Sequence, residues 1–124
     1  MNIFIHILRS DCMQTFTKRC WAKIDLDALR YNLEHIRKMA PENAQIMAVV
    51  KANAYGHGDG MVAAELERNG VNWFCVSNVE EAISLRKSGI TGKILILGMT
   101  APELASLLVE YKLVQTVYSP EYAK

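Results

Sequence analysis

The sequence predicts an α/β fold in which parallel strands alternate with helices. Four short apolar runs are separated by segments whose apolar residues recur every three or four positions. The connections between these segments are only a few residues long, which favours right-handed crossovers and strands that all run in one direction. A chain of 124 residues is long enough to form one domain with a core of its own.

The first predicted elements are a short strand and a helix. Residues 21–25 alternate apolar and polar side chains, which is the period of a half-buried strand. Asp25 is then placed to cap a helix whose apolar residues form a single stripe. The stripe consists of Leu26, Leu29, Leu33, Ile36 and Ala40, and residues 41–43 end the helix.

Residues 46–50 form a continuous apolar run, the pattern of a strand buried on both faces. Lys51 stands at the carboxyl end of this strand, where parallel α/β sheets bind ligands. A lysine in this place is more often the first solvated residue after a core strand. The loop that follows favours a functional lysine, because Gly56 and Gly58 permit positive φ and Tyr55 adds a phenol.

The rest of the chain repeats the alternation of strand and helix. A helix over residues 61–69 is expected to end at Gly70. Capping boxes at Ser77/Glu80 and at Thr100/Glu103, the second with Pro102 in its first turn, predict the starts of two further helices. Further strands are predicted over residues 73–76, 93–97 and 113–118, and another helix is expected to begin at residue 119.

Composition narrows the possible classes of function. The formal net charge is +1 with both signs interspersed, so there is no electrostatic case for a nucleic-acid or membrane partner. The three cysteines, Cys12, Cys20 and Cys75, lack paired spacing, which indicates free thiols in the cytoplasm and no metal site. Residues 3–8 are apolar but too short to span a bilayer. We expect residues 1–19 to be a poorly ordered leader and residues 20–124 to form the folded domain.

Residues 49–58, Val-Val-Lys-Ala-Asn-Ala-Tyr-Gly-His-Gly, resemble the pyridoxal-phosphate lysine signature of the alanine racemase family without a break. The stretch Trp-x-x-Ile-Asp-Leu-x-Ala-Leu, which begins at Trp21, also resembles the start of these enzymes. The resemblance implies that residues 20–124 are the N-terminal half of a (β/α)8 TIM-type barrel. It also implies that the chain is a fragment without the family's C-terminal β domain.

By this resemblance, Lys51 is the catalytic lysine that carries pyridoxal 5′-phosphate and takes the α-proton from one face of the substrate. Tyr55 would hydrogen-bond the cofactor phosphate, and Val49 and Leu97 would pack near its ring. Simple core packing is the alternative role for Val49 and Leu97. His57 is expected to order the loop by a hydrogen bond and not to act as a base.

The implied activity is the interconversion of L-alanine and D-alanine for peptidoglycan synthesis, by an enzyme that is a homodimer at full length. A serine racemase of the vancomycin-resistance type is the first alternative. A non-catalytic cofactor-binding barrel and an inactive truncated product are the others. The family's second base is a tyrosine from the partner subunit and has no counterpart in these 124 residues, so we expect the chain alone to be inactive.

Overall fold

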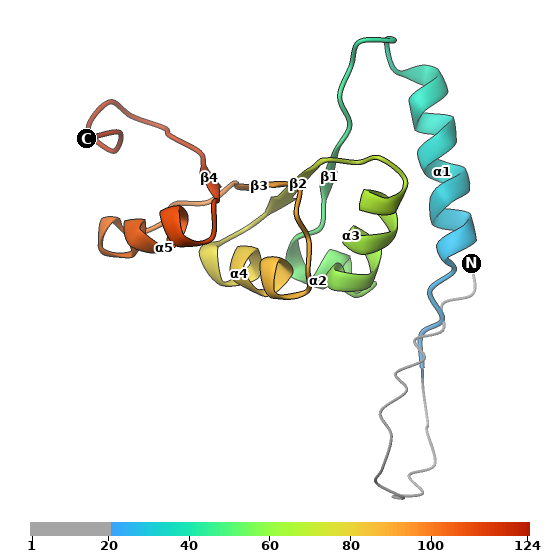
Figure 1. Ribbon diagram of the computed structural model, residues 1–124, viewed down its shortest axis with the longest axis horizontal. Helices are drawn as coiled ribbons and strands as arrows, with labels where there is room; N and C mark the ends of the chain where they lie inside the picture. Colours follow the sequence, from blue (N-terminus) through green and yellow to red (C-terminus); the bar gives the residue numbers. More distant parts are fainter. Residues whose placement is uncertain (1–20) are drawn as a thin grey trace, which may run out of the picture.

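The fold is a single parallel sheet with helices packed on one of its faces (Figure 1). The computed structural model describes residues 21–124, so the predicted leader, residues 1–19, lies outside the described residues. The strands lie in chain order, and each pairs in parallel with the next. They are β1 (Met47–Val49), β2 (Trp73–Val76), β3 (Lys93–Ile96) and β4 (Val114–Gln115). The predicted α/β class and the parallel direction of the strands are confirmed.

Helical segments connect the strands. In Figure 1, α3, α4 and α5 lie along the lower face of the sheet, and the long helix α1 stands beside the β1 edge. The predicted helix after Asp25 is confirmed as α1. The helical elements are α1 (Leu26–Met39), α2 (Lys51–Tyr55), α3 (Asp59–Arg68), α4 (Val79–Lys87), the 3₁₀ turn η1 (Pro102–Leu104) and α5 (Ala105–Glu110).

Helix α1 begins at the predicted cap but is less buried than its apolar stripe suggests. The Asp25 carboxylate accepts hydrogen bonds from the backbone N–H groups of Asp27 and Ala28, each at 3.0 Å. On the stripe only Leu33 is buried, while Ile36 is 49% exposed. The strand predicted before the helix is wrong. Residues 21–25 contain a single bridge residue, Lys23, and no continuous strand.

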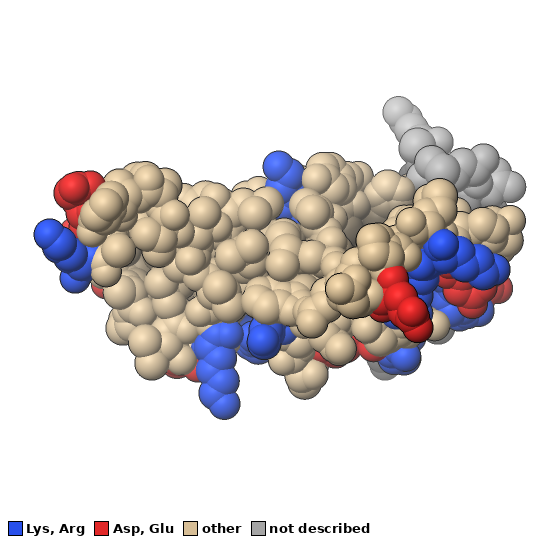
Figure 2. All heavy atoms as spheres, turned by 90° about the horizontal axis from the view of Figure 1, so that it is seen from above, with Lys and Arg blue, Asp and Glu red and all other residues tan. Residues whose placement is uncertain are grey.

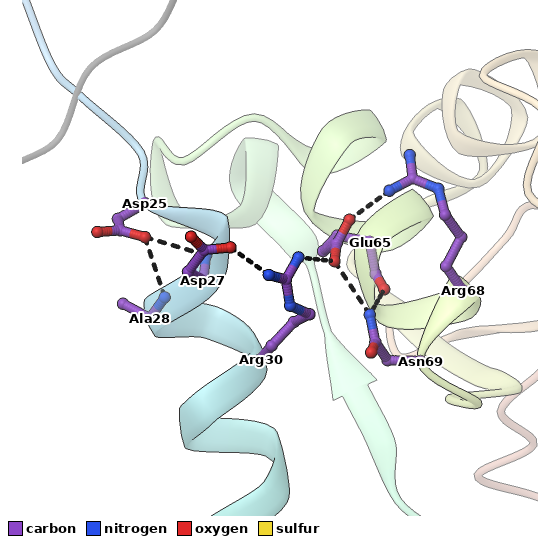
Figure 3. A network of polar contacts seen from close by, with 7 residues as sticks. All are labelled: Asp25, Asp27, Ala28, Arg30, Glu65, Arg68 and Asn69. Carbon is purple, nitrogen blue, oxygen red and sulfur yellow. Dashed lines mark hydrogen bonds and ion pairs between the residues drawn. The ribbon is translucent and has the colours of Figure 1, made fainter.

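A network of hydrogen bonds and ion pairs connects α1 to α3 (Figure 3). Glu65 on α3 is buried, and its carboxylate accepts a hydrogen bond from Arg30 of α1 at 3.0 Å. Arg68 and Asn69 also contact this carboxylate, and Asp27 pairs with Arg30. The hydrogen bond from Arg30 is the main reason that the pKa of Glu65 lies below its ordinary value. Helix α1 is therefore held against α3 partly by hydrogen bonds to a buried carboxylate, because little of its apolar stripe is buried.

The core lies between the sheet and its helices. Alternate strand residues such as Phe74, Ile94 and Ile96, together with Val50 just after β1, point to this side and are buried. Residues on the other face include Met47 at 40% and Val49 at 43% exposure, so the prediction of a strand buried on both faces is wrong. The reason is that no helix of residues 21–124 covers this face. Figure 2 looks onto it and shows charged side chains mainly at its margins.

Four predicted element starts or lengths are corrected. The cap of α4 is Asn78, not Ser77, and its side chain accepts from the Glu81 N–H at 2.9 Å. Thr100 does not cap a helix, because its hydroxyl instead donates to the Gln115 side chain at 2.6 Å. The helix predicted there begins as the 3₁₀ turn η1 before α5. The last strand is only β4, and residues 119–123 form a bend and a turn instead of a helix.

Candidate active site

Lys51 lies two residues after the end of β1, at the carboxyl edge of the sheet. The Val50 N–H still donates to the Cys75 carbonyl at 2.9 Å, so the sheet pairing reaches the residue before the lysine. Lys51 is half-buried, whereas Lys93 at the start of β3 is exposed. The lysine is therefore attached to a rigid strand and sits at the edge where parallel sheets bind ligands.

The chain after Lys51 forms a left-handed turn, which we define as residues 52–55. Ala52, Asn53, Ala54 and Tyr55 have φ values of 50°, 56°, 50° and 55°. A left-handed conformation costs a residue with a side chain about 1–2 kcal/mol, because its Cβ approaches the following carbonyl oxygen. From the sequence, positive φ was expected only at glycines. Gly56 and Gly58 do adopt it, at 87° and 89°, but the four residues before them do so as well.

Local hydrogen bonds hold the left-handed turn in place. The Gly56 N–H donates to the carbonyls of Ala52 and Asn53, and the Gly58 N–H donates to the Asn53 carbonyl at 2.9 Å. The side-chain oxygen of Asn53 accepts from the Asp59 N–H at 3.0 Å, at the start of α3. A strained segment persists only where its surroundings fix it from several sides. These bonds link the turn to the helix that follows it.

His57 has the loop-ordering contact that we predicted. Its Nδ1 lies 2.9 Å from the Ala54 carbonyl oxygen, so the ring donates to the left-handed turn. The same ring lines an apolar cavity of about 390 Å³ between α1 and the β1 edge. Leu29, Val49 and Ala54 also line this cavity. The contact to a carbonyl favours a structural role for the imidazole over a role as a base.

The other predicted cofactor residues lie at the same edge but do not close around Lys51. Val49 and Leu97 are 43% exposed, and the register of β1, β2 and β3 puts them on the open face of the sheet. Cys75 lies between their strands on that face, and burial raises the pKa of its thiol. Tyr55 ends the left-handed turn and is 60% exposed. The open face thus presents apolar side chains next to the lysine and leaves them accessible.

Glu81 is the residue at this edge that sequence analysis did not identify. Its carboxylate accepts from the Ala52 N–H at 2.9 Å and from the Ser77 N–H at 2.8 Å. The Ser77 carbonyl in turn accepts from the Gly98 N–H at 3.0 Å. The carboxyl ends of β1, β2 and β3 are therefore connected by one series of hydrogen bonds. The sequence signal was an Asn-x-x-Glu cap at residues 78–81, which the Ser77/Glu80 pattern obscured.

A second hollow lies at the opposite edge of the sheet and does not include Lys51. It has a volume of about 760 Å³ and is lined by Arg37, Trp73 and Lys93, among others. The Lys93 ammonium lies 4.7 Å from the centre of the Trp73 ring. Residues 21–124 contain no group of three or more His, Cys, Asp or Glu side chains arranged to hold a metal. Within the same residues, no helix has the length and hydropathy that crossing a bilayer requires.

Comparisons of the sequence with known proteins find a matching family model and relatives that are racemases. The family model "Alanine racemase, N-terminal domain" matches residues 24–124. An amino-acid racemase of Enterococcus faecalis is 49% identical over 107 residues, which cover 86% of this chain and 15% of the relative. An alanine racemase of Geobacillus kaustophilus is 44% identical over 110 residues, covering 89% of this chain and 29% of the relative.

Solved structures give the same result. An alanine racemase of Clostridium difficile superposes with a TM-score of 0.76 at 44% identity, over 79% of this chain and 26% of that one. An alanine racemase of E. faecalis superposes with a TM-score of 0.77 at 38% identity, over 81% and 27% of the two chains. The chain therefore spans less than a third of the length of these relatives.

Proposed function

Because this chain belongs to the alanine racemase family, we propose that it carries the cofactor lysine of a pyridoxal-phosphate-dependent amino-acid racemase. The observation that carries the proposal is the position of Lys51. It follows the first strand of a parallel sheet and lies within the unbroken signature of residues 49–58. The proposed substrate is alanine, as in the names of most of the relatives reported above. The name "amino-acid racemase" of the E. faecalis relative keeps serine as the alternative.

The side chains at the carboxyl edge fit pyridoxal 5′-phosphate. Lys51 supplies the amine that joins the cofactor aldehyde, and Tyr55 supplies a phenol that can donate to a phosphate oxygen. Val49 and Leu97 supply apolar surface for the ring on the open face of the sheet. Among residues 21–124, no other donor at this edge is assigned to the phosphate, so we expect weak retention of the cofactor by this chain alone.

The reaction needs a base on each side of the substrate α-carbon. When bound, the cofactor ring acts as an electron sink and makes the α-proton acidic. The Lys51 amine would accept or return that proton on one face. We propose that the base for the opposite face comes from a second subunit of a longer homodimeric protein in the cytoplasm, so that this chain alone does not racemise alanine.

Reductive labelling tests the proposal for Lys51. The chain is incubated with pyridoxal phosphate, treated with borohydride and digested, and the modified lysines are quantified by mass spectrometry. We expect Lys51 to be modified in strong preference to Lys93, and Lys51→Ala to remove that label while Lys93 is unaffected. Equal modification of both lysines would contradict the proposed function.

The same preparation tests the requirement for a second base. Alanine is incubated with the chain and cofactor in heavy water, and its α-deuterium content and chirality are then measured. We expect no inversion of configuration by the 124-residue chain. Inversion that depends on Lys51 would show that a complete site forms from these residues.

A further inference from the structure

The backbone strain of the left-handed turn requires stabilising contacts beyond the hydrogen bonds within the turn itself. Four successive residues with side chains adopt positive φ directly after the lysine, each at a cost. The bonds from Gly56 and Gly58 fix the end of the turn. The Ala54 N–H also donates to the Val50 carbonyl at 2.9 Å across the start of the turn, which leaves the Ala52 N–H, in the peptide between Lys51 and Ala52, to a partner from another part of the molecule. This peptide sets the direction in which the lysine side chain leaves the strand.

Glu81 provides that contact from the next helix. Its Oε1 accepts from the Ala52 N–H at 2.9 Å, and its Oε2 accepts from the Ser77 N–H at 2.8 Å. Both donors follow the ends of neighbouring strands, β1 and β2. Hydrogen bonds to an ionised carboxylate are roughly twice as strong as those between neutral groups. One side chain therefore fixes the two backbone segments that leave this edge of the sheet.

Capping of α4 can account for the bond to Ser77 but not for the bond to Ala52. The side chain of Asn78 already caps the helix by accepting from the Glu81 N–H at 2.9 Å. A carboxylate needed only for the helix would interact with the first turn of α4, whereas Glu81 reaches a residue 29 positions earlier. Glu80, its neighbour in the same turn, is exposed and provides a control with the same charge.

We propose that Glu81 is a positioning residue for Lys51, which holds the start of the left-handed turn so that the amine is presented at the carboxyl edge of the sheet. The inference rests on the proposed function only in its last step, the presentation of a reactive amine. The bridge between Ala52 and Ser77 is a property of the chain without cofactor. The two parts can be measured separately.

The experiment compares Glu81→Ala and Glu81→Gln with Glu80→Gln in the full 124-residue chain. Glutamine has the length of glutamate but one acceptor oxygen in place of two, so it can satisfy only one of the two N–H groups. Circular dichroism identifies variants that keep the fold. Amide hydrogen exchange by NMR then reports on Ala52 and Ser77, and reductive labelling reports the ratio of modification at Lys51 to that at Lys93.

Loss of a hydrogen bond to a carboxylate is expected to accelerate exchange about 10- to 100-fold. Glu81→Ala should do this at both amides and Glu81→Gln at one, while Glu80→Gln should change neither. The labelling ratio should fall about tenfold in Glu81→Ala, because a free turn directs the amine less often to the edge. If the wild-type chain is not labelled preferentially at Lys51, the proposed function is refuted. The hydrogen bonds from Ala52 and Ser77 to Glu81 are tested separately by the exchange data. Unchanged exchange at Ala52 in folded Glu81→Ala, or equal acceleration in Glu80→Gln, would overturn the inference.

Discussion

Replacing Ala52 with glycine should stabilise the chain, although the same change destabilises an ordinary helix. Ala52 is exposed, with φ 50° and ψ 49°, and its contacts to Glu81 and Gly56 use backbone atoms that glycine retains. Removing the Cβ relieves about 1–2 kcal/mol of left-handed strain. The greater freedom of glycine in the unfolded chain costs about 0.5–1 kcal/mol. The free energy of unfolding should therefore rise by about 0.5–1 kcal/mol.

Ala28→Gly is the matched control. Ala28 is also exposed, but it lies in the first turn of the right-handed helix α1, where glycine lowers stability by about 0.5–1 kcal/mol. Urea unfolding can be followed by the fluorescence of half-buried Trp73. For an m-value of about 1.5 kcal/mol/M, the midpoint should shift by about 0.3–0.7 M, upward for Ala52→Gly and downward for Ala28→Gly. A downward shift of equal size in both variants would show that residue 52 does not adopt the left-handed conformation.

Two further changes test the carboxyl edge and the packing of α1. Gly98→Ala would put a Cβ 2.6 Å from the Ser77 carbonyl oxygen, so the urea midpoint should fall by the equivalent of about 1–3 kcal/mol; an unchanged midpoint would show that the two strand ends are free to separate. The pKa of Glu65 is lowered chiefly by the hydrogen bond from Arg30, so its contribution to stability is present above the unfolded pKa of about 4.3 and is lost as the pH falls through the folded value. The stability advantage of the wild type over Glu65→Gln should therefore shrink on acidification below about pH 4.5, and an advantage independent of pH would refute the role of the carboxylate.

The alternation of strands and helices was predictable because the apolar pattern and the capping residues of each element lie within its own segment of the sequence. The run at residues 73–76 matches β2, and Asp25 caps α1 as its residue type suggests. The position of Lys51 followed from the same logic, since the apolar run of residues 46–50 ends at this lysine. These features depend on residues that are close together in the sequence.

The features that were missed depend on contacts between distant residues. The left-handed turn contains two alanines and an asparagine, and nothing in their local propensity indicates positive φ for alanine. Its bridge to Glu81 spans 29 residues and joins a side chain to a backbone group, which leaves no periodic pattern. Exposure of Val49 and Leu97 could not be inferred either, because an apolar run predicts burial without saying which face another element covers.

The bridge between Ala52 and Glu81 also limits when the lysine segment can reach its final conformation during synthesis. Residue 81 is translated 29 residues after residue 52, which takes about 1.5–6 s at 5–20 residues per second. Until α4 has emerged and packed against β2, the start of the left-handed turn lacks one of its acceptors. A nascent chain that contains only β1 and its loop therefore has the complete signature but not the fixed lysine. Competence to bind a cofactor would be acquired with the second crossover of the sheet, at the earliest.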